Sequence, residues 1–382
     1  MKTGDVTYET VVHIEELDSL ALEWDELVLA MKRPTPFLLY GWVRAWLRHL
    51  AGDTEPAIHV ARRDGRLVAA LPLVVHRRKG LRVAGFVGRD HPFVDILLAS
   101  SEGPETVRAL ATYATQSHDC ASLLAISAES TLAQACSERL RLVPRVCTPA
   151  LDLAADFEQT YREKYSSRKR HEHAHRRDEL AKLGKLEFEL ARTPDELTTA
   201  LEHAFRLHAL RWQGRFDTSE FIAPASVAFH REIAQNLAAK GVPRILSTCL
   251  DGLPIAFLYY FVLSGRMFCY RTAFDPAYAH CSPGLLSLLS AIERSNEEGV
   301  ATVELLGGTQ PYKVEIADRV EQLYGGVGLA SGVGGRSYAR ASAFGYGFRA
   351  RLARSPLMHR LYHRQAGPLL KRLHVLRRRG RD

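Results

Sequence analysis

The sequence has few of the features that mark secreted, metal-binding or membrane-spanning proteins. Its 382 residues include only six cysteines, scattered without a C-x-x-C pair, so neither a disulfide framework nor a zinc site is expected. The longest uninterrupted apolar run, Ile255–Leu263, is far shorter than the roughly 20 residues of a membrane-spanning helix. The opening Met1–Asp5 also lacks the apolar stretch of a signal peptide. These absences predict a metal-free protein of the cytoplasm.

Acidic residues are scarce at one end of the chain. Residues 336–382 contain 13 Lys and Arg against a single acid, whereas the preceding residues contain 38 basic and 42 acidic ones. The net charge of +8 therefore combines a body of about −4 with a strongly basic tail. Apolar residues recur at helical spacing in this tail, which predicts basic amphipathic helices of the kind that bind anionic membranes. Nucleic-acid binding and packing on the acidic body are the alternative roles.

The two segments Ile58–Asp90 and Ile245–Asp275 follow the same pattern. Each has a strand, an Asp-Gly pair, a second strand, a Gly turn, and a third strand that ends at an Asp ten residues beyond that Gly. Asp-Gly between strand-like runs predicts a hairpin, because both central residues of such a turn take positive φ. Each half of the chain is therefore expected to contain an antiparallel meander.

Helical sequence surrounds both predicted meanders. Amphipathic stretches precede them at 19–31, 41–50, 158–183 and 195–211, and one more follows each meander, at 104–116 and 284–298. This mixed order predicts an α+β fold, with largely antiparallel sheets flanked by helices. A chain of this length is expected to form two domains, over residues 1–152 and 153–335, followed by the basic helical tail over 336–382.

The segment Met267–Lys313 is the most informative part of the sequence for function. It reads as a strand, a helix opened by Ser282-Pro283-Gly284, a second strand, a Gly-Gly turn, and then Pro311-Tyr312-Lys313. A helix N-terminus with a cation nearby is a place where a diphosphate can bind. We therefore expect Ser282, Pro283, Gly284 and Lys313 to contact a phosphate-bearing coenzyme. The alternatives are an ordinary helix start and a surface lysine.

These motifs resemble those of the BioF2-like acetyltransferases of the GNAT superfamily. The matching elements are Phe274–Tyr278, Ser282–Gly284, Leu305–Gly308 and Pro311–Lys313. That group includes the CelD proteins of cellulose and exopolysaccharide clusters and is similar to the FemAB-type aminoacyltransferases. The resemblance spans Pro36 to Leu329. It implies two tandem GNAT-like domains, an acyl-CoA or acyl-tRNA donor, and an amine or hydroxyl acceptor.

The chain departs from the family pattern at two places. The family usually has an Arg before the second Gly of the turn and acids after it, where this chain has Gly307 and Thr309-Gln310. An aromatic residue is also common near the position of Ile316. Both departures concern the acceptor side more than the coenzyme side. In the first half, His91–Ile96 stands where the coenzyme motif would be, so only the second domain is expected to bind coenzyme.

Acyl transfer from a thioester needs a deprotonated acceptor, a stabilised oxyanion and a proton for the leaving thiolate. Glu304, on the strand after the predicted coenzyme helix, is the first candidate for the base, and Asp275 is the second. Tyr312 is the candidate for protonating the thiolate. The plainer roles of the same residues are an ion pair for Glu304, an Asp-Pro turn for Asp275 and packing for Tyr312.

Residues ahead of the second meander are candidates for holding the acceptor. Arg170 lies in a basic helix that faces the cleft between domains in the family, and Arg211-Trp212 resemble a motif near the acceptor groove. A solvated helix face and core packing are the alternatives. His171 and His175 are one helical turn apart, but no third zinc ligand is evident, so no metal is expected.

The sequence thus predicts an acyltransferase that moves acetyl from acetyl-CoA to an amine or hydroxyl of a sugar, exopolysaccharide or cell-envelope precursor. The expected partners are a small-molecule or glycan acceptor and an anionic membrane, contacted by residues 336–382 at the inner membrane surface. Two other functions stay open. One is aminoacyl transfer from tRNA, and the other is a non-catalytic membrane- or polysaccharide-associated module with a degenerate site.

Overall fold

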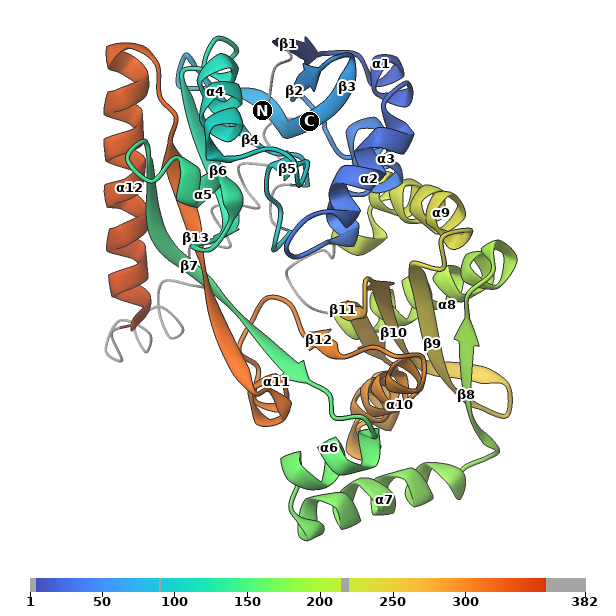
Figure 1. Ribbon diagram of the computed structural model, residues 1–382. Coiled ribbons are helices and arrows are strands. Elements are labelled where there is room, and N and C mark those ends of the chain that lie inside the picture. The colour runs from blue at the N-terminus through green and yellow to red at the C-terminus, as the bar shows by residue number, and fades with distance from the viewer. Residues whose placement is uncertain (1–4, 89–90, 214–219, 355–382) are drawn as a thin grey trace.

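The computed structural model describes residues 5–88, 91–213 and 220–354. These residues form one continuous mixed sheet with helices on both faces (Figure 1), which confirms the predicted α+β class. The strands follow the order β1 (Val6–Val11), β2 (Glu55–Arg63), β3 (Arg66–Arg78), β4 (Leu81–Phe86), β6 (Cys120–Ser127), β13 (Arg319–Gly328), β7 (Leu140–Asp152), β12 (Thr302–Glu304), β11 (Arg266–Phe274), β10 (Leu253–Leu263), β9 (Pro243–Leu250) and β8 (Leu186–Ala191). A further short strand, β5 (Leu97–Leu98), lies outside this order and pairs with β3.

The two halves of the chain repeat one arrangement of strands, as the sequence predicts. β1–β4 form one antiparallel meander and β8–β11 form another. The Asp-Gly turns have the expected geometry, since φ is 51° and 80° at Asp64-Gly65 and 48° and 77° at Asp251-Gly252. Each meander is followed by a helix, α4 (Pro104–Ala114) or α10 (Pro283–Glu297), and then by a strand parallel to the last strand of the meander.

The halves are joined by two long strands. β13, from the C-terminal half, inserts between β6 and β7 of the N-terminal half and pairs with both. β7 in turn ends beside β12, with Asp152 opposite Thr302. The sheet is continuous from one half to the other for this reason.

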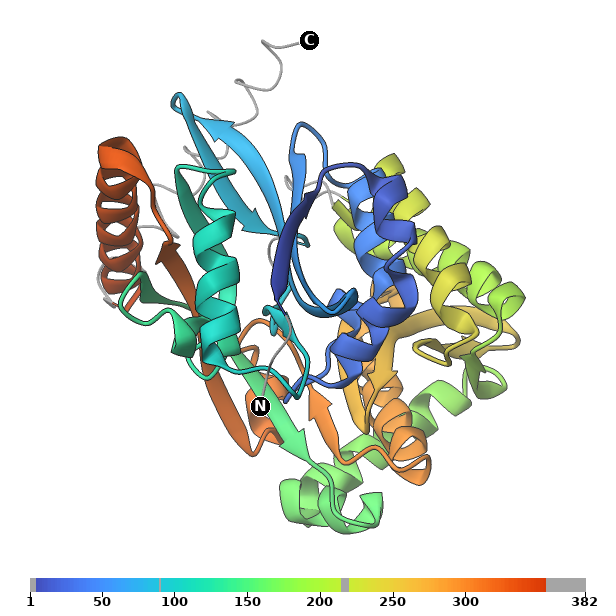
Figure 2. The same ribbon diagram turned by 45° about the horizontal axis from the view of Figure 1, so that its top comes forward.

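Helices cover both faces of the C-terminal half of the sheet. α8 (Pro194–Trp212) and α9 (Pro224–Ala238) pack on one face, and α10 packs on the other. In the N-terminal half, α3 (Tyr40–His49) lies beside α9 (Figure 2). One buried core continues across this junction, where the Trp42 ring meets Phe229 and Phe261 edge-on at centroid distances of 5.0 and 5.3 Å. Other helices and helical turns include α1 (Ile14–Asp18), α2 (Ala21–Leu29), η1 (Pro36–Leu38), α5 (Thr131–Ala135), η2 (Glu220–Ile222), η3 (Pro276–Cys281) and α11 (Pro311–Ile316).

One predicted helix is divided in two. The pattern over residues 158–183 suggested a continuous helix, but α6 (Phe157–Lys164) ends before Tyr165 and α7 (Ser167–Ala181) starts anew. The Ser166 hydroxyl caps α7 by accepting from the Lys169 amide, and the Arg170 guanidinium donates to the Tyr165 carbonyl at 2.5 Å. The prediction of one helix was wrong because these side chains satisfy backbone groups at the break.

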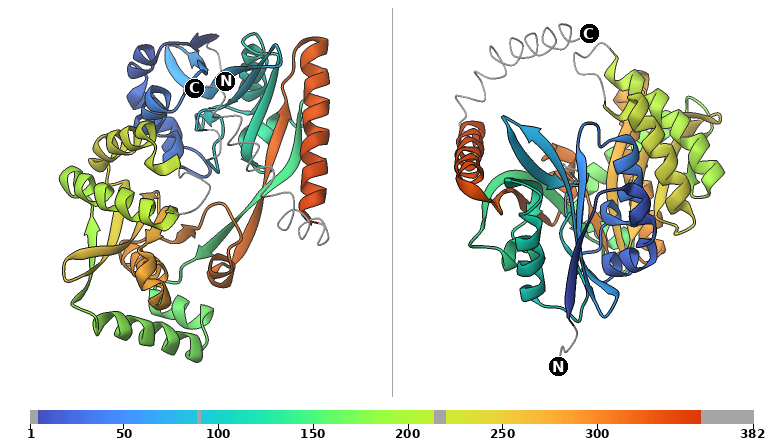
Figure 3. Two further views of the ribbon diagram at one scale, coloured as in Figure 1. Left: turned by 180° about the vertical axis from the view of Figure 1, so that it is seen from behind. Right: turned by 90° about the horizontal axis from the view of Figure 1, so that it is seen from above.

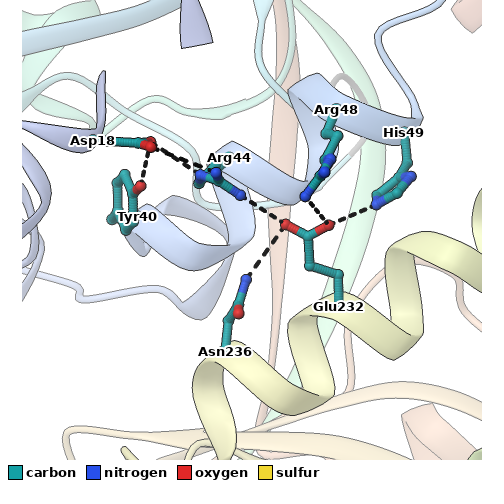
Figure 4. Close-up of polar contacts among 7 residues, drawn as sticks. All are labelled: Asp18, Tyr40, Arg44, Arg48, His49, Glu232 and Asn236. Carbon is teal, nitrogen blue, oxygen red and sulfur yellow. Dashed lines mark hydrogen bonds and ion pairs between the residues drawn. The ribbon is translucent and has the colours of Figure 1, made fainter. Parts of the chain in front are cut away.

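A polar network ties α3 to α9 (Figure 4). The Glu232 carboxylate accepts hydrogen bonds from Arg44 at 3.2 Å, Arg48 at 3.4 Å and His49 at 2.7 Å. Arg44 also donates to Asp18, and this bond, together with one from the Tyr40 hydroxyl, holds the pKa of Asp18 below its usual value. The two halves are therefore joined by charge as well as by the shared apolar core.

The basic tail begins inside a long helix, α12 (Gly332–Arg354), which packs on β6, β7 and β13. On its inner side Ala343 is buried, and the Tyr346 hydroxyl lies 3.2 Å from the Ser122 hydroxyl. α12 is the outermost element on its side of the molecule (Figure 3). The rest of the predicted tail, 355–382, lies outside the described residues. No helix among the described residues combines the length and the apolar composition needed to cross a bilayer.

Candidate functional site

A gap opens between two neighbouring strands of the C-terminal half. β11 and β12 are parallel and pair from Arg266–Thr302 to Phe268–Glu304. β12 ends there, whereas β11 continues to Phe274. Just beyond this point β10 and β11 change register, which leaves Tyr270 without a Cα partner on β10. Such a bulge bends a strand and re-aims its side chains, and here it lies just beyond the end of β12.

A cleft of about 490 Å³ lies at this gap. Its walls come from β11, the start of α10, and residues of α7, α8 and α11. Five of the residues predicted from the sequence to form the site line it together: Arg211, Ser282, Gly284, Tyr312 and Lys313. Segments separated by more than a hundred residues therefore meet in one cleft.

The N-terminus of α10 forms one wall of the cleft. Ser282 has left-handed backbone angles (φ 51°, ψ 49°), and its hydroxyl does not cap the helix but accepts a hydrogen bond from Arg176 at 2.8 Å. Pro283 occupies the first turn and is buried. A Cβ added to Gly284 would lie 3.2 Å from the Phe274 ring, so glycine permits the close approach of helix and strand. A helix start without a side-chain cap, beside a cation, favours a bound anion.

The cleft is strongly basic. Lys169 and Arg176 are seven residues apart on α7, a spacing that places both on the same helix face, and both line the cleft. Lys169 pairs with Glu315 at 3.3 Å, and Glu315 is the single acid among the lining residues. The sequence prediction did not single out these two cations, and their spacing alone could not have identified them, because Arg170 and Arg177 share it and do not line the cleft. The cationic lining residues are Lys169, Arg176, Arg211, Arg271 and Lys313.

Lys313 lies where β12 ends. Its Nζ donates to the carbonyl oxygens of Leu305 at 2.7 Å and Gly307 at 3.2 Å. Burial lowers the pKa of the ammonium group, and the Arg271 guanidinium lowers it further. An ammonium group has three donors, and these two bonds use two of them. Lys313 thus fixes the backbone at the gap while it also lines the cleft.

Burial keeps two further cleft residues neutral. It raises the pKa of Tyr312 to about 12 and that of Cys269 to about 12. At neutral pH the Tyr312 hydroxyl therefore keeps its proton and can donate it to a ligand. The Cys269 thiol is not ionised, so it is a poor nucleophile.

Tyr270 connects the cleft to the N-terminal half. Its hydroxyl lies 3.5 Å from Nε2 of His91, and the two rings stack with centroids 5.7 Å apart. Nδ1 of His91 is 2.6 Å from the Gly88 carbonyl oxygen and donates to it, so Nε2 is the nitrogen that accepts from tyrosine. Burial lowers the pKa of His91 to about 4 and keeps the ring neutral. The sequence prediction named neither residue as part of the site, because neither stands in a recognisable motif.

Glu304 and Asp275 are not among the residues that line the cleft. Val303 and Leu305 belong to the core beneath α10, so Glu304 points to the opposite face of the sheet, where it pairs with Arg266 at 2.6 Å. The Glu304 carboxylate is 1% exposed, and burial raises its pKa. Asp275 accepts from the Ala277 amide at 2.9 Å and so caps η3. These contacts correspond to the plainer roles considered for both residues.

The three predicted acceptor contacts are placed differently from one another. The Arg211 guanidinium lies over the Phe274 ring at 4.0 Å and lines the cleft. The Trp212 ring stacks on the His208 ring, with the two centroids 5.9 Å apart. Arg170 donates to the Tyr165 carbonyl at the break between α6 and α7 and does not line the cleft. Within the described ranges, no group of three or more His, Cys, Asp or Glu side chains is placed to hold a metal ion.

Several solved structures share the fold of this chain over most of its length. FemX matches with a TM-score of 0.59 at 9% identity, over 88% of this chain and 100% of its own. The C-terminal domain assigned to a lysylphosphatidylglycerol synthetase of Agrobacterium fabrum matches with a TM-score of 0.54 at 13% identity, over 81% of this chain and 92% of its own. L-PGS from Bacillus licheniformis matches with a TM-score of 0.50 at 14% identity, over 81% of this chain and 96% of its own. At these identities the likeness concerns the fold alone.

One family model matches the part of the sequence that forms the cleft. No curated protein matches the chain. Residues 167–314 match the family model of the acetyltransferase (GNAT) domain. This stretch contains every residue that lines the cleft except Glu315. The similarity to the GNAT acetyltransferase domain therefore covers the part of the chain that forms the cleft.

Proposed function

We propose that the protein transfers an acyl group, acetyl from acetyl-CoA in the first instance, to an amine or hydroxyl of a sugar or cell-envelope precursor. The resemblance to BioF2-like and CelD proteins supports this choice of acceptor and includes exopolysaccharide precursors. One observation carries the proposal: a basic cleft opens between β11 and β12 at the N-terminus of α10, inside the residues that match the GNAT domain.

The cleft offers groups that suit each part of such a donor. Phosphates would bind at the start of α10, beside Arg176 and Lys169. The pantetheine arm would lie in the gap past Cys269 and Leu305, where β11 has no strand beside it. The thioester would then reach Tyr270, at the bulge of β11.

In this proposal the acceptor attacks the thioester carbonyl, so that a C–N or C–O bond forms and the C–S bond breaks. Tyr270 takes the acceptor's proton while it passes its own to Nε2 of His91, which, with a pKa of about 4, releases that proton at once to solvent. Tyr312 protonates the leaving thiolate and is itself reprotonated from solvent. We assign stabilisation of the oxyanion to a backbone amide of β11 at the bulge, beyond the end of its pairing with β12. Glu304, paired with Arg266 on the opposite face, has a structural role here.

Calorimetric titration with acetyl-CoA tests the donor site. We expect binding to wild-type protein and a loss of about ten- to a hundredfold in Lys313→Ala, the range for one charge-assisted hydrogen bond. Lys182→Ala is the matched control, because Lys182 is 68% exposed and pairs with Glu179 outside the cleft. Equal affinity of the wild type and Lys313→Ala would remove Lys313 from the site. Absence of binding to the wild type would reject acetyl-CoA as donor.

A second candidate is aminoacyl transfer from tRNA. The observation that favours it is the excess of cations on α7, which exposes Arg168 and Arg177 beyond the two cations that line the cleft. Backbone phosphates of a long nucleic acid would use such a surface, whereas a coenzyme would not reach it. Salt-sensitive binding of tRNA by a protein that does not bind acetyl-CoA would support this candidate over the first.

A further inference from the structure

The outer face of α12 exposes two phenylalanines. Phe344 and Phe348 are 75% and 54% exposed, and no other phenylalanine in the part of the chain that the structure describes is classed as exposed. Their rings stack on each other with centroids 6.4 Å apart. Packing of the helix on the sheet does not require them, because Ala343 and Tyr346 occupy the inner face. Two large apolar side chains are therefore directed away from the fold.

Exposed residues of α12 lie along one stripe of the helix. Val333, 75% exposed, precedes Phe344 by eleven residues and Phe348 by fifteen, so all three lie on the same side of an α-helix. Arg336 and Arg340 are exposed beside this stripe. The helix thus has a packed face and an outer face, on which the exposed Ser337 and Arg340 lie between Val333 and the two phenylalanines.

The surroundings of α12 carry positive charge. Residues 322–381 contain no Asp or Glu. From the neighbouring strands, the exposed Arg145 guanidinium lies 6.0 Å from the centre of the Tyr346 ring, and Arg78 lines a small pocket beside the same tyrosine. The sequence beyond the helix, 355–382, adds eight Lys and Arg. A partner of this face must therefore accept both apolar rings and cations.

We propose that α12 is a docking surface for an anionic lipid bilayer. Phe344 and Phe348 enter the boundary between headgroups and acyl chains, and Arg336 and Arg340 contact lipid phosphates. A nucleic acid duplex would satisfy the arginines but would leave the phenyl rings in water. Docking through α12 leaves the opposite side of the molecule, with α8 and α9, facing away from the lipid (Figure 3). The proposal does not depend on the transfer reaction.

Flotation of the full-length protein with lipid vesicles tests this surface. We expect the protein to float with vesicles of phosphatidylcholine and phosphatidylglycerol and to remain unbound with phosphatidylcholine alone. The double variant Phe344→Glu, Phe348→Glu should lose at least about tenfold in partitioning, because it places two charges in the apolar interface. Its melting temperature should not change, since both side chains are exposed.

α2 supplies a matched control for the phenylalanine variant. Leu22 and Leu29 are 83% and 53% exposed on α2, in the N-terminal half, so Leu22→Glu, Leu29→Glu makes the same change of charge at equally exposed apolar sites. Flotation should persist in this control. Equal loss in the two double variants would mean that net charge alone governs binding, and would overturn the assignment of α12.

The arginines are tested in the same way. Arg336→Gln, Arg340→Gln should weaken binding about fivefold for each arginine removed. Lys182→Gln, Lys185→Gln removes the same charge from exposed lysines elsewhere and should have little effect. Failure of the wild type to float with anionic vesicles would reject the proposal. Binding to duplex DNA that is lost in the arginine variant but kept in the phenylalanine variant, without flotation, would assign the face to nucleic acid instead.

Discussion

The Tyr270 hydroxyl lies 3.5 Å from Nε2 of His91, and the two residues come from different halves of the chain. Tyr270 stands at the bulge of β11 and lines the cleft, whereas His91 belongs to the connection after β4. Arg271, His230 and Tyr259 are other titratable groups beside this pair. The N-terminal half has no counterpart of the Ser282-Pro283-Gly284 motif, yet it contributes a side chain to the candidate site.

Replacement of Tyr270 by phenylalanine should slow acyl transfer without weakening donor binding. The ring would still fill its place among aromatic neighbours, but no hydroxyl would remain to pass a proton to His91. A positioned acid or base typically contributes about a hundredfold or more to the rate. Release of CoA from acetyl-CoA, with hydroxylamine as the acceptor, measures the rate, and calorimetry measures affinity.

Tyr259 provides the control for that variant. Its ring packs against Tyr270 at 5.7 Å, but its buried hydroxyl has no hydrogen-bond partner. Tyr259→Phe should therefore leave the rate unchanged. His91→Gly should lose rate as Tyr270→Phe does and recover part of it with added imidazole, an effect that a purely structural role would not produce. Equal rates in Tyr270→Phe and the wild type would exclude Tyr270 from proton transfer.

Much of the fold could be predicted because residue pairs that favour tight turns mark the ends of several strands in this sequence. Asp64-Gly65 and Asp251-Gly252 required positive φ, and the structure has it at both pairs. The insertion of β13 between β6 and β7 could not be predicted in this way. Strand periodicity shows that a segment is a strand, but partners far apart in sequence are chosen by packing that periodicity does not report.

The candidate site could be predicted only where a local motif marks it. Ser282, Gly284 and Lys313 stand in such motifs, and they lie in the same cleft. Tyr270 lies inside an ordinary strand pattern, and its position depends on the register change opposite Tyr259 and Tyr260. Glu304 was expected in the site but does not line the cleft. Side chains alternate along β12, and this alternation places Glu304 on the opposite face of the sheet.

Two adjacent arginines of α7 should differ in their effect on donor binding. Arg176 lines the cleft and donates to Ser282, whereas the Arg177 guanidinium lies 5.9 Å from the centre of the Phe188 ring and does not line it. Arg176→Ala should weaken acetyl-CoA binding about tenfold or more, and the loss should shrink at high salt. Arg177→Ala should stay within about twofold of wild type. Equal affinities of the two variants would contradict binding of phosphate at Arg176.

The link between α3 and α9 should contribute measurably to stability. The Glu232 side chain is 15% exposed and accepts from three cationic or imidazole groups, so Glu232→Ala should lower the free energy of unfolding by about 1–3 kcal/mol. Glu202 also sits between α8 and α9, but its pair with Arg231 is about half exposed, so Glu202→Ala should cost less than about 1 kcal/mol. Urea unfolding of both variants measures the difference, and similar losses would argue against a special role for Glu232.

Acid should destabilise the protein well above the range in which carboxylates are protonated. Burial lowers the pKa of His59, His91, His118 and His208 to about 4, against an ordinary value of 6.5 in the unfolded chain. Between these values the unfolded state binds more protons, so the free energy of unfolding falls as the pH is lowered, by up to about 1.4 kcal/mol per pH unit for each histidine. Asp95 and Glu304 act in the opposite direction, because burial raises the pKa of both carboxyls, that of Asp95 to about 6, but two groups offset only part of the effect of four.

His208 allows this titration to be separated from the rest of the fold. Its Nδ1 is buried without a hydrogen-bond partner, and its ring packs beside Phe221 at 4.9 Å, so His208→Phe should fold and should remove one titrating group. Urea unfolding from pH 7.5 to pH 5 should give a shallower slope for this variant than for the wild type. Asp18 does not interfere, because its lowered pKa places its own loss of stability below the ordinary carboxylate range. A wild-type free energy of unfolding that stays constant down to pH 5 would mean that these histidines are not buried as neutral rings.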